Sequence, residues 1–145
     1  MEHTLIYKTK EFISLTKKEY IKDDDLVTAC SEMNEGLHDA DLRGNVYKKR
    51  IASKLRGKRS GYRVIIGANI GDKYFLLFAF AKNTKANINT KEKLALKELA
   101  HEFLSLSQVE IEELVKKWEQ GQSAPRGAAL KMLSIAEKKG LEVIA

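Results

Sequence analysis

Two strongly apolar segments separated by a tight turn constrain the fold of this chain more than any other feature. Residues 62–68 (YRVIIGA) and 74–81 (YFLLFAFA) are typical of β-strands, and residues 69–72 (NIGD) have the composition of a turn. An apolar segment this short, with polar ends, favours a central strand over a membrane span, which needs about 20 residues. A further strand is predicted at 46–52, and the short connections predict an antiparallel meander of three strands.

The part of the chain from Leu42 to Gly71 carries nine basic side chains and no acidic one. The basic residues are Arg43, Lys48, Lys49, Arg50, Lys54, Arg56, Lys58, Arg59 and Arg63. They exceed the formal net charge of +6 on the whole chain of 145 residues, so the rest of the protein is slightly acidic. Because the run is interleaved with predicted strands, it predicts a shaped cationic surface, for which RNA is the expected polyanion. A solvated basic face is the alternative interpretation.

Strand alternation divides the first basic residues between the two faces of the sheet. Lys48 and Arg50 are predicted on one face, whereas Lys49 is predicted on the other. The segment 54–61 is rich in Gly, Lys and Arg and is predicted to be a loop. Arg63 is predicted to enter the next strand directly afterwards, so the loop and both strands would present basic groups to one ligand.

The residues before this region predict a strand and two helical segments. A short strand is expected at 3–8, followed by a short helix or turn within 9–20. Three aspartates supply an N-cap and favourable first-turn charge for an acidic amphipathic helix at 23–35. Gly36 is placed to end that helix in the left-handed conformation.

The residues after residue 90 predict a helical C-terminal part. A helix at 91–104 is expected to direct one apolar face inward, formed by Leu94, Ala95, Leu99 and Phe103. Ser107 and Glu110 have the spacing of a capping box for the next helix. Gly121–Gly127 is the clearest linker, and a last helix is predicted at 128–139.

Composition excludes several classes of protein. We find no apolar run near 18 residues, no signal peptide and no lipidation motif, so we expect a cytoplasmic protein without a membrane partner. The single cysteine, Cys30, excludes an intrachain disulfide and fits a reducing compartment. The three histidines are scattered and no Cys/His cluster has metal-ligand spacing, so no metal site is predicted.

The segment GNVYKKRIASKLRGKRSGYRVII, followed by a strand ending in AFAKN and a Leu-rich helix, resembles the RelE/HigB-like toxins of bacterial toxin–antitoxin modules. The similarity covers roughly residues 4–104 in order and spacing. It implies an α+β fold: a RelE-like small antiparallel sheet with two N-terminal helices, to which this chain adds a C-terminal helical extension. We therefore expect a toxin domain at 1–104 and a helical extension at 105–145.

The resemblance also implies a function. Toxins of this kind are ribosome-dependent mRNA endonucleases that inhibit translation, and they need neither metal nor cofactor. The ribose 2′-OH attacks the adjacent phosphate, so the site must supply a proton acceptor, positive charge and a proton donor. The expected partners are a cognate antitoxin, the ribosome and mRNA. The expected catalytic residues are Arg63, Lys82, Lys54 and Lys58. The expected RNA-binding residues are Lys48, Arg50, Arg56, Arg59 and Tyr62.

Two parts of this site stay open at the level of sequence. The general base is a lysine with a depressed pKa among like charges, or Tyr62, or a group that the ribosome and mRNA supply. Members of the family often carry two tyrosines after the G-x-R motif, where this chain has Ile66 and Gly67. Tyr47, Tyr62 or Phe80 is then the candidate to stack on a base.

The C-terminal segment at about 117–145, KWEQGQSAPRGAALKMLSIAEKKGLEVIA, resembles the end of an Xre/HigA-type helix-turn-helix antitoxin. This suggests a toxin joined to an antitoxin fragment. A recognition helix would fall at 108–119, but it carries Glu110, Glu112, Glu113 and Glu119, which oppose a phosphate-lined groove. We expect contact with operator DNA only through an antitoxin. The alternatives are a helical extension that covers the sheet, and a catalytically weakened toxin–antitoxin hybrid that acts as an antitoxin-binding or DNA-binding regulator.

Overall fold

The computed structural model describes residues 4–17, 21–53, 57–81, 87–119, 130–137 and 140–143. At residues 52, 53, 57–60, 118, 119, 130–137 and 140–143 the structure describes the backbone. The elements are β1 (Thr4–Thr9), α1 (Lys10–Thr16), α2 (Asp23–Asn34), β2 (Ala40–Arg43), β3 (Val46–Ser53), β4 (Gly57–Asn69), β5 (Lys73–Ala81), α3 (Thr90–Leu104), α4 (Gln108–Glu119), β6 (Leu130–Glu137) and β7 (Gly140–Val143). The α+β class and the two N-terminal helices are confirmed.

The strands form one sheet with the order β2-β3-β4-β5-β1-β6-β7. The predicted meander β3-β4-β5 is confirmed, since both of its pairings are antiparallel. The expectation of an all-antiparallel sheet is wrong at one place, because β1 pairs with β5 in parallel. A parallel neighbour requires a crossover connection, and α1 and α2 lie within the chain segment between β1 and the meander.

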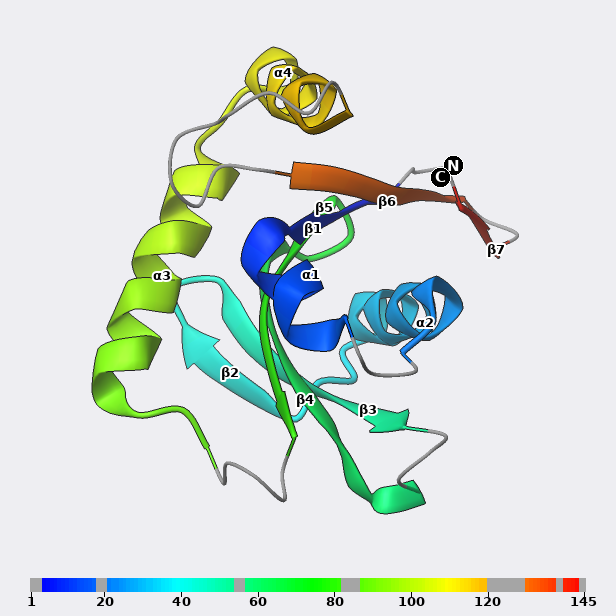
Figure 1. Cartoon of the computed structure of the whole chain (residues 1–145), viewed down its shortest axis with the longest axis vertical. Helices are drawn as coiled ribbons and strands as arrows, with labels where there is room; N and C mark the ends of the chain where they lie inside the picture. The colour runs from blue at the N-terminus through cyan, green and yellow to red at the C-terminus, as the bar shows by residue number, and fades with distance from the viewer. Residues whose placement is uncertain are drawn as a thin grey trace.

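Helices cover both faces of the sheet (Figure 1). Each face has its own apolar cluster. The helices α1 and α2 pack on one face, over a cluster that includes Phe12, Met33 and Val64. On the other face α3 packs over a second cluster, which includes Ile65 and Phe103. We call these the α2 face and the α3 face.

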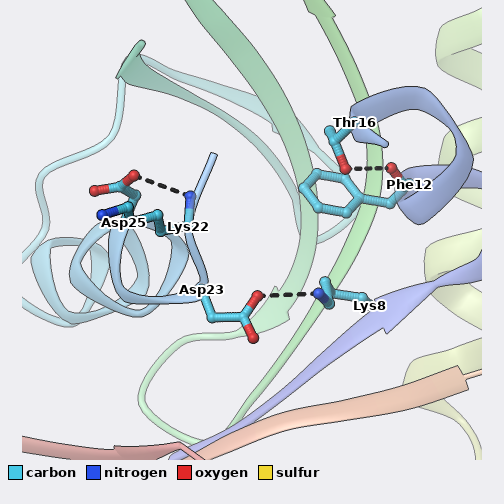
Figure 2. Close-up of polar contacts among 6 residues, drawn as sticks. All are labelled: Lys8, Phe12, Thr16, Lys22, Asp23 and Asp25. Carbon is cyan, nitrogen blue, oxygen red and sulfur yellow. Dashed lines mark hydrogen bonds and ion pairs between the residues drawn. The ribbon is translucent and has the colours of Figure 1, made fainter. Parts of the chain in front are cut away.

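Side-chain hydrogen bonds stabilise the beginning and the end of α1. The Thr9 hydroxyl accepts a hydrogen bond from the Phe12 N–H at 3.2 Å and so caps the helix. The Thr16 hydroxyl donates to the Phe12 carbonyl at 2.9 Å (Figure 2). The Phe12 side chain is fully buried, which fixes this short helix on the sheet.

The acidic N-terminus of α2 forms an ion pair with strand β1. Figure 2 shows the Lys8 ammonium of β1 beside the Asp23 carboxylate, with an N–O distance of 3.0 Å. The Asp25 carboxylate accepts from the Lys22 N–H at 3.1 Å, so Lys22 is the N-cap and Asp23 is already helical. Gly36 follows α2 with φ +86°, as predicted for the residue that ends this helix.

The capping box at Ser107 and Glu110 is confirmed: each side chain accepts from the other's backbone N–H. The predicted inward face of α3 is partly wrong, because Leu94 is 59 % exposed and Ala95 is also exposed. The sheet lies against a neighbouring stripe of the helix, formed by Leu96, Ala100 and Phe103.

Two predictions about connecting segments are wrong. The loop expected at 54–61 is wrong from Gly57 onward, because β4 begins at Gly57, which pairs with Ser53 of β3. The helix expected at 128–139 is instead strand β6, which pairs with β1 in antiparallel register. Helical periodicity is a local signal, whereas this strand is held by a partner more than 120 residues away in the chain. The linker at 121–127 lies outside the described residues.

The sheet also has a strand that the sequence did not predict. β2 pairs with β3 through a tight turn in which Arg43, Gly44 and Asn45 all have positive φ. Such a turn is short and lacks the Asn-Gly or Asp-Gly order that marks hairpins most clearly. Within the described part of the chain, no helix is both long and apolar enough to cross a bilayer.

Candidate nucleic-acid interface

Two cross-strand rows on the meander assemble the predicted basic residues. Arg50 of β3 lies opposite Arg63 of β4, which lies opposite Phe80 of β5. In the neighbouring row Lys48 lies opposite Ile65. Directly opposed residues in antiparallel strands project from the same face, so both rows present their side chains together.

These rows lie on the α3 face. Ile65 and Phe80 belong to the apolar cluster beneath α3, so Arg50, Arg63 and Lys48 project to that side as well. The Arg50 side chain is exposed, and Lys48 is partly buried. The prediction that alternation brings Lys48 and Arg50 to a common face is confirmed.

Arg63 is the member of this group with unsatisfied hydrogen-bonding capacity. Its side chain is partly buried, and its Nη1 atom is buried without a hydrogen-bond partner among the described residues. A guanidinium has five N–H donors in a planar fork that matches phosphate oxygens. Because a buried donor without a partner costs about 1–3 kcal/mol, a bound phosphate oxygen would relieve the penalty.

A β-bulge adds an aromatic side chain that sequence reasoning missed. The register passes from Ile65 opposite Phe78 to Ile66 opposite Leu76, so Leu77 is an extra residue in β5. Simple alternation would send Phe78 to the α2 face, but the bulge places Leu77 and Phe78 together on the α3 face. Phe78 is partly exposed beside the arginine row, and its ring centroid lies 6.3 Å from that of Phe80.

Lys49 lies on the same strand as Lys48 and Arg50, but its side chain projects to the opposite face of the sheet and forms an ion pair. Its ammonium lies 2.7 Å from the Glu32 carboxylate of α2, on the α2 face. The residue is only 9 % exposed, so this charge is neutralised inside the protein and does not contribute to the basic face. Nearby, burial raises the pKa of the Cys30 thiol, and the Lys49 charge only partly opposes that shift.

The expectation that Tyr62 contacts RNA does not agree with its position. Tyr62 is 5 % exposed and packs in the cluster beneath α1 and α2, on the face opposite Arg63. Tyr47 packs against the same cluster, with its ring 5.1 Å from His38. Of the three aromatic residues expected to replace the missing tyrosines, only Phe80 lies on the α3 face, and it is 6 % exposed.

Five predicted site residues fall within or close to two segments outside the described residues, 54–56 and 82–86. Lys54, Arg56 and Lys82 lie outside the described residues, although Lys82 directly follows the last residue of β5. The backbones of Lys58 and Arg59 lie in β4. Their roles remain predictions.

The strand β6 lies away from the basic rows. In the sheet order, β5 and β1 separate it from β4, which carries Arg63. The helix α4 contacts β6 and stands beside it at the same side of the molecule (Figure 1). The described part of the C-terminal segment therefore extends the sheet beyond β1, and its strand does not lie over the meander.

Comparison with known proteins agrees with this geometry. The family model described as the RelE toxin of the RelE/RelB toxin–antitoxin system matches residues 4–120, which include the whole meander, α3 and α4. A search of curated proteins found no match. Since the family model covers most of the chain and its sheet and helices are present in the expected order, the protein belongs to the RelE toxin family.

Proposed function

We propose that this protein is a translation-inhibiting toxin that cleaves mRNA on the ribosome, as a metal-independent endoribonuclease. The observation that carries the proposal is the arginine row, in which Arg50 and Arg63 stand in register on two central strands. Arg63 has a buried Nη1 without a partner among the described residues, as expected for a group that awaits an anion. Family members are toxins paired with an antitoxin, and this chain is expected to have a cognate antitoxin as its first partner.

The chemistry requires stabilisation of a phosphorane more than it requires covalent catalysis. When the 2′-OH attacks the adjacent phosphate, negative charge grows on the non-bridging oxygens. We assign the binding of these oxygens to Arg63, because its side chain is partly buried and charge interactions are stronger away from bulk water. Arg50, exposed on the neighbouring strand, would bind the same or the next phosphate.

The mechanism also requires a group that accepts the proton of the 2′-OH. Tyr62 is unsuited to the role because it is buried on the opposite face. Two sources remain in the proposal: Lys54 or Lys58, with a pKa lowered by surrounding positive charge, or a group supplied by the ribosome and mRNA. Lys82, which directly follows β5 in the chain, is proposed as the second catalytic member of the phosphate clamp beside Arg63. Arg56 and Arg59 are proposed as further RNA-binding residues.

The aromatic contact is assigned to Phe78. It is partly exposed on the same face as Arg63, and β-bulges often redirect side chains next to active sites. A base lifted out of its stack could lie on this ring while its phosphate binds the arginines. Phe80, which is more deeply buried, would support the ring of Phe78 from the side.

A second candidate rests on the C-terminal segment. We infer that residues 105–145 form an extension to a toxin domain at 1–104, with the end of the segment derived from an Xre/HigA-type antitoxin. In this chain β6 occupies the edge of β1 within its own sheet. A hybrid of this kind would act as a weakened toxin that binds antitoxin and reaches operator DNA only through it.

Induction of the chain in growing bacteria, followed by mapping of mRNA ends, separates the two functions. An active toxin arrests growth and produces cuts at codon-related positions in translated messages. Arg63→Ala is expected to abolish both effects, and Arg63→Lys to retain part of them because one positive charge remains. A chain that neither arrests growth nor cuts mRNA, yet binds a co-expressed antitoxin, supports the hybrid.

A further inference from the structure

The charged residues of helix α3 are divided by sign between different sides of the helix. Its buried side is formed by Leu96, Ala100 and Phe103. At about 100° of rotation per residue, Lys93 and Lys97 fall together on one flank of this buried side, and both are partly buried. Glu92 and Glu102 fall on the opposite flank, and Glu98 falls on the outer side.

The cationic flank of α3 is the one that faces β3. The aliphatic part of the Lys97 side chain packs against the β2–β3 turn. Its Cδ would lie 3.6 Å from a Cβ atom added to Gly44. Lys93 lies one helical turn earlier on the same flank. The turn beneath Lys97 also carries Arg43, which is exposed and has φ 73°.

The strands on this side add positive charge and no negative charge among the described residues. Lys48 and Arg50 project to the α3 face, as their partners Ile65 and Arg63 show. Asp41 of β2 pairs with Tyr47, so its carboxylate projects to the α2 face, where it accepts from the Arg43 N–H at 2.8 Å.

We propose that Arg43, Lys48, Lys93 and Lys97 form a second phosphate-binding surface, which holds the backbone of single-stranded RNA beside the cleavage site. This inference rests on the proposed function, since it names the path of the same substrate away from the arginine row. Residues two apart in a strand are separated by about 6.6 Å, so Lys48 continues the line of Arg50 toward the turn. Lys48 is carried by a strand, and Lys93 and Lys97 by a helix that packs on the same face of the sheet.

An extended polyanion fits this surface better than an acidic protein segment. Lys97 reaches the turn before β3, and Lys48 on β3 lies two residues from Arg50, which pairs with Arg63. The positive charges therefore extend from the helix flank through the turn to the row that carries Arg63. Contacts of this kind bind phosphates and carry no base specificity, so they would strengthen binding to any message and leave codon preference to other residues.

The test measures binding separately from cleavage. A fluorescent single-stranded RNA with 2′-O-methyl groups throughout has no attacking 2′-OH, so it reports affinity alone. Binding of the full chain is titrated at several salt concentrations for the wild type, Lys97→Gln and Lys91→Gln. Lys91 is the matched control because it is an exposed lysine on the far side of the same helix.

Each lost phosphate contact on a single strand should reduce the slope of log K against log salt by about 0.7. We expect this change for Lys97→Gln, together with a several-fold loss of affinity at low salt, and no change for Lys91→Gln. Equal slopes for both variants would overturn the inference, as would a wild type that does not bind this RNA. An acidic peptide that binds through Lys97 while RNA does not would overturn it too.

The outcomes separate this inference from the proposed function. Cleavage of mRNA by the wild type, combined with an unchanged slope for Lys97→Gln, rejects the second surface alone. Lys97-dependent binding by a chain that produces no cuts rejects the endoribonuclease and retains the surface. Thermal unfolding of each variant shows whether a loss of binding arises from a loss of fold.

Discussion

Gly67 of β4 and Ala100 of α3 approach so closely that no side chain fits between them. A Cβ added to Gly67 would lie 2.9 Å from the Ala100 Cβ and 3.3 Å from a Leu77 methyl. The helix α3 docks on the sheet at this point, and the missing side chain of Gly67 allows the close approach. An aromatic ring here would displace the helix.

Gly67→Ala should therefore destabilise the protein by about 1–3 kcal/mol through overpacking. Ala100→Gly in the same chain should restore part of the loss, although the new glycine costs helix stability by about 1 kcal/mol. Urea unfolding of the single and double variants gives the coupling energy between the two positions. A coupling near zero would contradict the proposed close approach.

The Glu32–Lys49 pair predicts an asymmetry between its two partners. Glu32→Gln leaves the 9 % exposed Lys49 ammonium without its carboxylate and should cost roughly 1–2 kcal/mol, since Glu32 itself is half exposed. Lys49→Met removes the charge and keeps the volume, so it should cost less. Equal losses in denaturant unfolding would show that the pair contributes through attraction rather than through the burial of Lys49.

Tyr74 predicts a loss of stability in alkali. Burial is the main cause that raises the pKa of its hydroxyl to about 12, while the Gly71 N–H, which donates to that hydroxyl at 3.1 Å, acts in the opposite direction. The hydroxyl in turn donates to the Asn34 side chain. Because the unfolded chain releases this proton near pH 10, the contribution is complete below pH 10 and is lost as the pH rises toward 12.

Tyr74→Phe should lower stability at neutral pH and flatten the decline between pH 10 and pH 12. Thermal unfolding across that interval checks both effects. The slope should not vanish, because burial also raises the pKa of Tyr7 and of Cys30. An alkaline slope that is unaltered in the variant would contradict this assignment.

Phe78→Leu tests the aromatic platform. The change preserves apolar contact with the α3 face and removes the ring, so binding of the 2′-O-methyl RNA should weaken by about 1–3 kcal/mol. Phe78→Tyr keeps the ring and should bind like the wild type. Similar affinities of the leucine and tyrosine variants would exclude stacking at this position.

The sequence allowed the central strands, the acidic helix at α2 and the division of Lys48, Lys49 and Arg50 between faces to be predicted. All of these depend on local periodicity. The features that it did not reveal depend on distant partners. The bulge at Leu77 is defined by the register between β4 and β5. The strand β6 forms by pairing with the edge of β1. The packing of Tyr62 on the far face follows from its parity with Val64, which could have been read from the sequence.

The most direct test of the account is mRNA cleavage in a reconstituted translation reaction, with wild-type protein, Arg63→Ala and Lys49→Met compared at equal concentration. The 5′ ends of the fragments are mapped by primer extension. The account predicts cuts in the ribosomal A site with the wild type and with Lys49→Met, whose position lies on the α2 face. It predicts no cuts with folded Arg63→Ala. Cleavage by Arg63→Ala at the wild-type rate would contradict the central claim that this arginine row forms the site.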